Sequence, residues 1–199
     1  MASNSGNQDE DRLSFRSRLR RAKIAEREAL PVTERLRAEQ VIIGHLDILL
    51  AKQAPRTLAF CMPVRAEVDC RPLICRLLDA GWSACQPVVV ETEAPMLFRP
   101  WTPTTTMALD RYGIPIPANG NPVLPDIVLL PLVAFDAAGF RLGYGGGYFD
   151  RTLAALPGRL AIGVGFELCH VDSTRPGRHD LPLDAIITET GTRNLTKPA

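Results

Sequence analysis

Short apolar runs alternate along the chain with segments whose composition is typical of helices. Strands are predicted over 57–62, 82–90, 96–101, 126–131, 160–166 and 184–188, and helices over 13–29, 33–50, 70–80 and 147–156. Thr33 and Asp69 are placed to cap the second and third helices. A short strand without polar residues fits a sheet that is covered on both faces. The alternation therefore predicts an α/β fold, a mostly parallel sheet between layers of helices, preceded by N-terminal helices.

The length of 199 residues fits one domain, expected over 12–192 between a disordered tail at 1–11 and a C-terminal tail at 193–199. Residues 102–125, rich in Pro and Thr, are expected to be irregular, and 132–146 to be a loop. A net charge of +1 gives no support for binding to nucleic acid or to a membrane surface. The polar, acidic start does not resemble a secretory signal, so a cytoplasmic protein is expected. Five cysteines without a CxxC pair favour reduced thiols over disulfides or a zinc site.

The most informative segment is a glycine-rich stretch between a predicted strand and a predicted helix. Five glycines lie within residues 139–147, after the strand that ends at Pro131. Ligands of open α/β sheets bind beyond the carboxyl ends of strands, and glycines allow backbone N–H groups to approach a phosphate. The following helix adds partial positive charge, and Asp150 in its first turn could reach a Mg²⁺ ion on the same phosphates. A flexible hairpin is the alternative, which the neighbouring aromatic and charged residues disfavour.

Three further groups of residues have both a functional and a structural interpretation. Arg16 and Arg20 lie four apart and can face one anion, although a solvated basic helix would look the same. Glu67 could accept hydrogen bonds from a ligand or simply favour the start of a helix. Tyr112, in the sequence YGIPIP, could stack on a ligand or belong to a structural turn.

The sequence RLGYGGGYFDRTL at 141–153, preceded by Ala134-Phe135-Asp136, resembles the signature of 5-formyltetrahydrofolate cyclo-ligases. Four other stretches are similar to that family: RSRLR at 16–20, MPVRAEVDC at 62–70, YGIPIP at 112–117 and HDLPLD at 179–184. The resemblance covers the chain from about Arg16 to Thr188. It implies a three-layer, Rossmann-like sandwich akin to the sugar-phosphate isomerase and CoA-transferase group.

The resemblance also implies an activity. Such a ligase uses ATP and Mg²⁺ to convert 5-formyltetrahydrofolate, including polyglutamylated forms, to 5,10-methenyltetrahydrofolate, and it releases ADP and phosphate. ATP would phosphorylate the formyl oxygen, and N10 of the folate would then close the ring. A monomer is expected.

The same resemblance implies roles for individual residues. Catalytic roles fall to Arg141, Tyr148 and Asp150, and the magnesium ligands would be Asp150 and Asp180. The nucleotide would be bound by Arg16, Arg20, Arg141, Leu142, Gly143, Tyr144, Gly145, Gly146, Gly147, Tyr148 and Phe149. The folate would be bound by Met62, Glu67, Tyr112, Tyr144, Gly145, Gly146, Gly147, Tyr148 and Phe149. Ile116 and the region of Cys169 depart from the family pattern, which has polar residues there.

Two other functions remain as alternatives. A sugar-phosphate isomerase on a related scaffold would use the glycine-rich loop for a substrate phosphate and would not need ATP. A non-catalytic folate-binding module would have no use for a metal site, so the presence of both Asp150 and Asp180 speaks against it.

Overall fold

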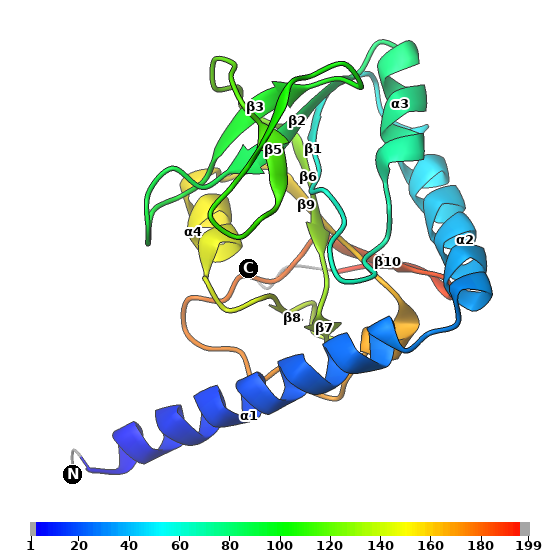
Figure 1. The fold of residues 1–199 in the computed structure, drawn as a ribbon. Coiled ribbons are helices and arrows are strands. Elements are labelled where there is room, and N and C mark those ends of the chain that lie inside the picture. Colours follow the sequence, from blue (N-terminus) through cyan, green and yellow to red (C-terminus); the bar gives the residue numbers. More distant parts are fainter. Residues whose placement is uncertain (1–2, 196–199) are drawn as a thin grey trace.

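A seven-stranded sheet forms the centre of the computed structural model, which describes residues 3–195 and the side chains of residues 9–195 (Figure 1). Its strands, in spatial order, are β11 (Gly191–Asn194), β10 (Ala185–Thr188), β9 (Leu160–Val164), β6 (Ile127–Pro131), β1 (Thr57–Ala59), β2 (Ser83–Val88) and β3 (Leu97–Trp101). The pairs from β10 to β2 are parallel, and only the two edge strands pair antiparallel. The predicted α/β class and mostly parallel sheet are confirmed.

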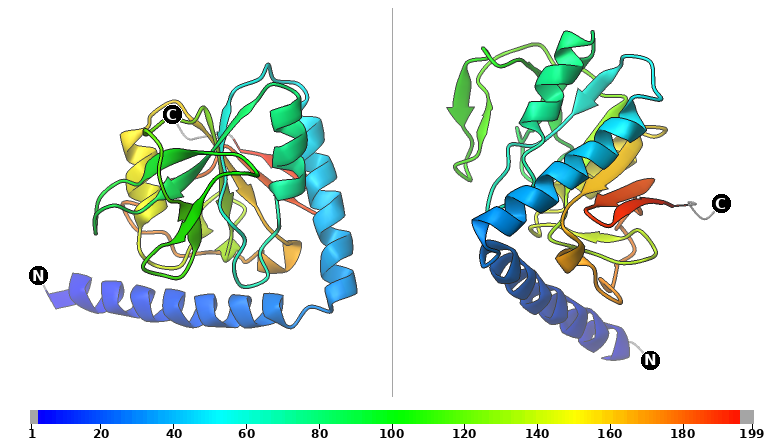
Figure 2. Two further views of the ribbon diagram at one scale, coloured as in Figure 1. Left: turned by 45° about the horizontal axis from the view of Figure 1, so that its top comes forward. Right: turned by 90° about the vertical axis from the view of Figure 1, so that its right-hand side faces the viewer.

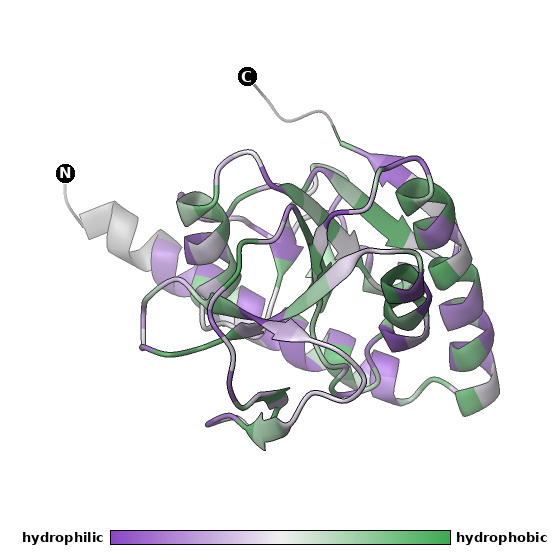
Figure 3. Ribbon diagram, turned by 90° about the horizontal axis from the view of Figure 1, so that it is seen from above, coloured by the Kyte–Doolittle hydropathy of each residue, from purple (hydrophilic) through white to green (hydrophobic). Residues whose placement is uncertain are grey.

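Helices cover both faces of this sheet. Helices α2 (Val32–Leu50) and α3 (Arg71–Asp79) pack on one face, where they meet Ile127 and Leu129 of β6. The alternate residues of β6, Val128 and Leu130, lie in a second core cluster with side chains of α4 (Tyr148–Ala155). Figure 2 shows these layers from two further sides, and Figure 3 shows α2 as alternating hydrophilic and hydrophobic bands, as expected for a helix with one covered face.

Helix α1 (Ser3–Glu28) is not part of either layer. It lies across the edge formed by the carboxyl ends of the parallel strands, here called the carboxyl edge (Figure 1). There it contacts β7 (Ala134–Phe135), which follows β6, and the 3₁₀ helix η1 (Glu167–Cys169), which follows β9. Among its predicted apolar positions, Ile24 is buried but Leu13 is exposed. Contacts other than an apolar stripe therefore hold much of α1 in place.

Both expected tails differ from the structure. Residues 3–11 belong to α1. Once the later part of α1 is formed, each further residue that joins the helix adds one hydrogen bond and needs no new nucleation. The pair Arg12–Asp9, with 3.0 Å between Nη2 and Oδ1, lies within this extension. At the other end, residues 193 and 194 complete β11, which pairs with β10. Residues 1–2 and 196–199 lie outside the described part of the chain.

Two segments expected to be irregular contain small hairpins. Residues 102–125 include β4 (Met107–Leu109) and β5 (Pro115–Pro117), joined by a turn in which the Asp110 carboxylate accepts two backbone N–H groups. Residues 132–146 include β7 and β8 (Arg141–Leu142). Strands of two or three residues give too little periodicity to be read from sequence. Both predicted caps are displaced: Cys70 rather than Asp69 occupies the N-cap of α3, although the Asp69 carboxylate still accepts the Arg71 N–H, and Pro31 rather than Thr33 occupies the N-cap of α2.

Asp136 organises the turn between β7 and β8. It is 4% exposed, and its carboxylate accepts the N–H groups of Ala138 and Phe140 together with the N–H and hydroxyl of Thr174. Four donors converge on one buried carboxylate, so this residue of the Ala134-Phe135-Asp136 motif has a structural role.

Asp136→Asn should lower the free energy of unfolding by about 2–3 kcal/mol, because the amide NH₂ cannot accept and must face a donor. Urea denaturation followed by circular dichroism measures the change. Asp172→Asn, the same substitution at an exposed aspartate, is the control and should change stability by less than about 0.5 kcal/mol. Equal effects of the two substitutions would contradict this role.

Candidate active site

The chain reverses its direction of winding between two central strands. After β1 it adds β2 on one side, whereas β6, β9 and β10 follow on the other side of β1. In open α/β sheets, ligands usually bind where the segments leave the carboxyl ends of two such strands, here β1 and β6, and this region is here called the crevice. The segment after β1 carries Glu67, and the segment after β6 carries the glycine-rich loop (residues 143–147). The two meet where the Tyr144 hydroxyl donates to Glu67 Oε1 over 2.6 Å.

One face of α1 supplies four cations to this crevice. Arg16, Arg20, Lys23 and Arg27 are spaced by four, three and four residues, so they share a face. Arg20 Nε donates to the Gly143 carbonyl over 2.7 Å, and Lys23 Nζ donates to the Leu168 carbonyl over 2.8 Å. Each cation thus reaches a loop at the carboxyl edge. The solvated basic helix considered for Arg16 and Arg20 does not describe their environment.

The glycine-rich loop combines open backbone with nearby positive charge. Gly147 has φ +65° and is the N-cap of α4, so the orphan N–H groups of that helix lie at the end of the loop. Gly145 has φ +102°, and a Cβ there would lie 3.2 Å from Arg20 Nη2. Arg151 closes the far side by donating to the Gly146 carbonyl over 2.5 Å. Side chains at these positions would be strained and would displace the arginines.

Two ion pairs lie side by side next to the loop. Arg16 Nη1 is 2.6 Å from Asp180 Oδ2, and Arg141 Nη2 is 3.1 Å from Asp150 Oδ1. Leu181, which directly follows Asp180, connects the two pairs. Its N–H donates to Asp150 and its carbonyl accepts from Arg141. Burial lowers the pKa of Arg141, and Asp150 and Asp180 both oppose that shift. The sequence-predicted metal ligands are therefore brought together, each neutralised by an arginine.

These two carboxylates set limits on the kind of metal that fits. Within residues 9–195, no three or more His, Cys, Asp or Glu side chains form a cluster that could enclose a cation. An ion at Asp150 and Asp180 would need its remaining ligands from phosphate oxygens and water. Mg²⁺ binds in this way, whereas structural zinc does not.

Glu67 presents a buried carboxylate that has both polar partners and apolar neighbours. It is 6% exposed, and it borders a small cavity lined by Cys61, Pro63 and the end of β6. Burial raises the pKa of Glu67, and hydrogen bonds from the Tyr144 hydroxyl and the Val64 N–H, with the charge of Arg27, oppose the rise. A carboxylate with spare acceptor capacity at the wall of a crevice suits a ligand that offers N–H donors.

The aromatic candidates come from two different elements. Tyr112, at the tip of the β4–β5 hairpin, lies with its hydroxyl 3.2 Å from that of Tyr148 in the first turn of α4. Phe149 packs partly against the second core cluster, with Arg141 6.0 Å from its ring centre. Met62 packs against the first core cluster, after β1. The hydroxyls of Tyr112 and Tyr148 thus lie together, whereas Phe149 and Met62 each pack against one of the two core clusters.

Leu142 differs from the other predicted residues of the loop. Its side chain is fully buried, and its carbonyl accepts the Val133 N–H. Its side chain therefore anchors β8 and the loop in the core and cannot itself touch a bound molecule.

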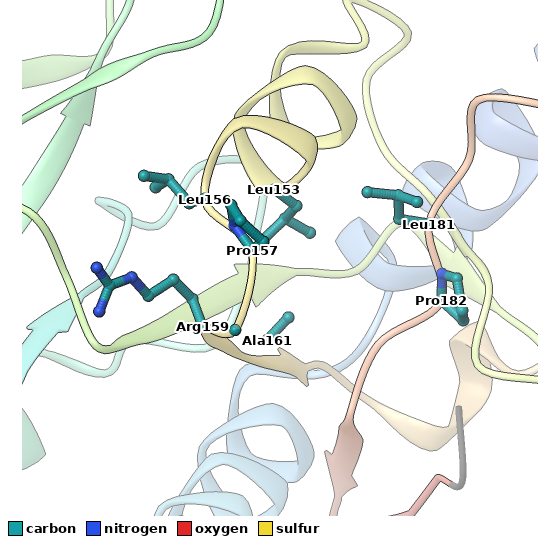
Figure 4. A pocket seen from close by; sticks show the side chains of 8 residues that line it. Leu153, Leu156, Pro157, Arg159, Ala161, Leu181 and Pro182 are labelled. Carbon is teal, nitrogen blue, oxygen red and sulfur yellow. The ribbon is translucent and has the colours of Figure 1, made fainter. Parts of the chain in front are cut away.

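A pocket of about 310 Å³ lies between the C-terminal end of α4 and the segment that carries Leu181 and Pro182 (Figure 4). It is lined by Leu153, Leu156, Pro157, Gly158, Arg159, Ala161, Leu181 and Pro182. None of these residues belongs to the glycine-rich loop or to the segment after β1. This hollow adjoins the site described above at Leu181, whose backbone contacts Asp150 and Arg141, but does not include the loop.

Arg27 and Lys23 were not predicted from the sequence, and Arg151 counted only among the charged neighbours that favour a functional loop, with no role of its own. The helical spacing of cations that indicated Arg16 and Arg20 continues to Lys23 and Arg27, and this signal could have found both. Arg151 gave no such signal, because its contact with the loop depends on how α4 leaves Gly147.

Comparison with known proteins gives a consistent result. A model of the 5-formyltetrahydrofolate cyclo-ligase family matches residues 10–189. The 5-formyltetrahydrofolate cyclo-ligase of Haemophilus influenzae is 31% identical over 166 residues, 79% of this chain and 89% of that protein. The enzyme of Escherichia coli with the same name is 35% identical over 140 residues, 66% of this chain and 77% of that protein.

Solved structures agree with this assignment. The NMR structure of Aquifex aeolicus 5,10-methenyltetrahydrofolate synthetase superimposes with a TM-score of 0.79 at 28% identity, over 93% of this chain and 95% of that one. A Mycoplasma pneumoniae 5,10-methenyltetrahydrofolate synthetase gives 0.72 at 26% identity, over 87% and 98%. The chain is therefore a ligase and belongs to the 5-formyltetrahydrofolate cyclo-ligase family.

Proposed function

We propose that this ligase converts 5-formyltetrahydrofolate to 5,10-methenyltetrahydrofolate with consumption of ATP in the presence of Mg²⁺. The main support is one juxtaposition: a buried carboxylate that can accept from a pterin lies in direct contact with a glycine-rich loop that can hold phosphates. A phosphoryl transfer between two bound molecules needs such adjacent sites, because most of its catalysis is alignment and charge neutralisation.

Residues of the segment after β1, of the β4–β5 turn and of the first turn of α4 would bind the folate. Glu67 would accept hydrogen bonds from the ring N–H and amino groups of the pterin. The flat ring system would lie against Tyr112 and Tyr148, with Phe149 and Met62 below it. The formyl group on N5 would then face the glycine-rich loop.

The loop and the arginines around it would bind the nucleotide. Backbone N–H groups from Gly143 to Gly147 and the N-terminus of α4 would receive phosphate oxygens. Arg16, Arg20 and Arg141 now donate to acceptors within the protein, and they could exchange part of these bonds for phosphate oxygens.

The proposed reaction conserves atoms and charge. The formyl oxygen attacks the γ-phosphorus, and the bond from that phosphorus to the β–γ bridging oxygen breaks to release ADP. N10 then attacks the activated formyl carbon and loses its proton, and the C–O bond breaks to release phosphate. A formamide oxygen is a poor leaving group, which is why the reaction needs ATP.

Asp150 and Asp180 would hold Mg²⁺, directly or through water. When bound, the ion would neutralise developing charge on the transferred phosphoryl group. Arg16 and Arg141 would balance the two carboxylates in the absence of the ion.

We also propose that the protein acts in the cytoplasm as a monomer and accepts polyglutamylated folates. All five cysteines are free thiols, as is usual in a reducing compartment. In the described part of the chain, no helix is long and apolar enough to cross a bilayer.

The direct test mixes the protein with 5-formyltetrahydrofolate and MgATP and follows the absorbance of the methenyl product. Product should form with ATP and not without it. Tight folate binding without turnover would instead support a binding module. Isomerisation of a sugar phosphate without ATP would support the other alternative.

Asp150→Asn should lower kcat at least about 100-fold, because Asn keeps the acceptor for the Leu181 N–H but removes the charge that would bind Mg²⁺. Initial rates over a Mg²⁺ titration measure this, with the exposed Asp172→Asn as the matched control. A kcat within threefold of the unsubstituted enzyme would exclude the metal role.

The dependence of kcat/KM on pH should report the protonation of Glu67. Because burial raises the pKa of Glu67, kcat/KM for the folate should fall on the acid side at a pH above the ordinary glutamate range, as the carboxylate gains a proton and loses acceptor capacity. Glu67→Gln should lower kcat/KM about 10–100-fold and remove this acid limb. An unchanged acid limb in the variant would assign it to another group.

A further inference from the structure

Arg27 lies at the centre of the only buried arginine network that joins α1 to both segments of the crevice within residues 9–195. It is 1% exposed. Nε donates to the Arg65 carbonyl over 2.9 Å and Nη1 to the Leu132 carbonyl over 2.8 Å. Nη2 donates to the Tyr144 hydroxyl over 3.0 Å and lies 3.7 Å from Glu67 Oε1. One guanidinium thus touches the loops that follow β1 and β6 at once.

Removing an arginine from water costs several kcal/mol unless its donors and its charge are matched. Here three donor atoms have oxygen acceptors, and the charge faces the Glu67 carboxylate. The match depends on Tyr144, because its hydroxyl accepts from Arg27 and donates to Glu67. Burial and the neighbouring Glu67 both raise the pKa of Tyr144, so the hydroxyl keeps its proton and its donor role.

We propose that Arg27 and Tyr144 are positioning residues that couple the two substrate sites: Tyr144 orients the Glu67 carboxylate only while the glycine-rich loop holds the conformation seen in this structure. The inference rests on the proposed function, because it assumes a folate at Glu67 and a nucleotide at the loop. Neither Arg27 nor the Tyr144 hydroxyl needs to contact the reacting atoms.

The direction of the coupling follows from the hydrogen bonds. The Val64 N–H donates to Glu67 Oε2 and the Tyr144 hydroxyl donates to Glu67 Oε1, which fixes the orientation of the carboxylate. Each oxygen keeps a further lone pair for a ligand. A nucleotide bound to the loop would stabilise this position of Tyr144, so the carboxylate would keep its orientation when the folate arrives. By linkage, a folate on Glu67 must strengthen nucleotide binding by the same factor.

The test measures this factor with ligands that cannot react. Calorimetry measures the Kd of the protein for the Mg²⁺ complex of β,γ-imido-ATP. The measurement is made once without 5-formyltetrahydrofolate and once with saturating 5-formyltetrahydrofolate. The ratio of the two values should be about fivefold or more in the unsubstituted protein, the lower end of typical coupling. Tyr144→Phe keeps the ring and removes the hydroxyl, and the ratio should fall to within twofold of one.

The ratio separates coupling from simple contact. If the Tyr144 hydroxyl only contacted one ligand, its loss would lower the affinity for that ligand by the same factor whether or not the other ligand is bound. The ratio would then be unchanged. Arg27→Lys, which keeps the charge but cannot reach three acceptors together, should also reduce the ratio. Thermal unfolding of each variant checks that it is folded, and Tyr144→Phe suffices should Arg27→Lys not fold.

A matched control lies at the surface of the same contact between α1 and the segment after β1. Glu28 pairs with Arg65 over 2.8 Å, and the Glu28 side chain is 40% exposed and does not touch Glu67 or Tyr144. Glu28→Gln should leave both the ratio and the turnover unchanged. An unchanged ratio in Tyr144→Phe, in a protein that still binds both ligands and forms product, overturns the coupling and not the proposed function. Absence of any product from the unsubstituted protein overturns the proposed function instead.

Discussion

The cations on one face of α1 hold together the parts of the candidate site. Arg16, Arg20, Lys23 and Arg27 reach acceptors on the segments after β1 and β6, on η1 and at Asp180. In most surface helices the inward face is apolar and is buried against a core. Here much of the inward face is basic and is satisfied by loop carbonyls and carboxylates. Helix α1 is therefore both a structural brace and the main source of positive charge in the crevice.

This arrangement keeps a basic site stable without a ligand. Within each of the ion pairs Arg16–Asp180 and Arg141–Asp150, the two side chains neutralise each other's charge. Arg20 donates a hydrogen bond to the Gly143 carbonyl. On binding, phosphate oxygens would pair with the arginines and a divalent cation would pair with the carboxylates. The number of charge-assisted hydrogen bonds need not fall in such an exchange, so the positions of the side chains can be set before binding.

The sheet decides where the crevice forms. Because the winding reverses between β1 and β6, their following segments diverge and can face each other across a ligand. Glu67 on one side and Tyr144 on the other are 77 residues apart in sequence but share a 2.6 Å hydrogen bond. This contact joins Glu67, which the family resemblance assigns to the folate, to the loop that it assigns to both the nucleotide and the folate.

Much of the fold could be predicted from the sequence, because buried strands and amphipathic helices carry local patterns of hydrophobicity. The same is true of the glycine-rich loop, whose residues must accept positive φ at Gly145 and Gly147. The hairpins within 102–125 and 132–146, the helical residues 3–11 and the strand β11 could not be predicted, since pairing partners and an extended neighbouring helix decide them.

By itself the sequence determined the α/β class, the position of the loop and the residue types available for binding phosphate and folate. Only the tertiary structure decided which of these residues share partners. Asp136 became a buried turn residue, Leu142 an anchor in the core, and Arg27 the link between Glu67 and Tyr144. The physical reason is that periodicity records which side of an element is buried, whereas hydrogen bonds between distant segments depend on how the elements are placed in space.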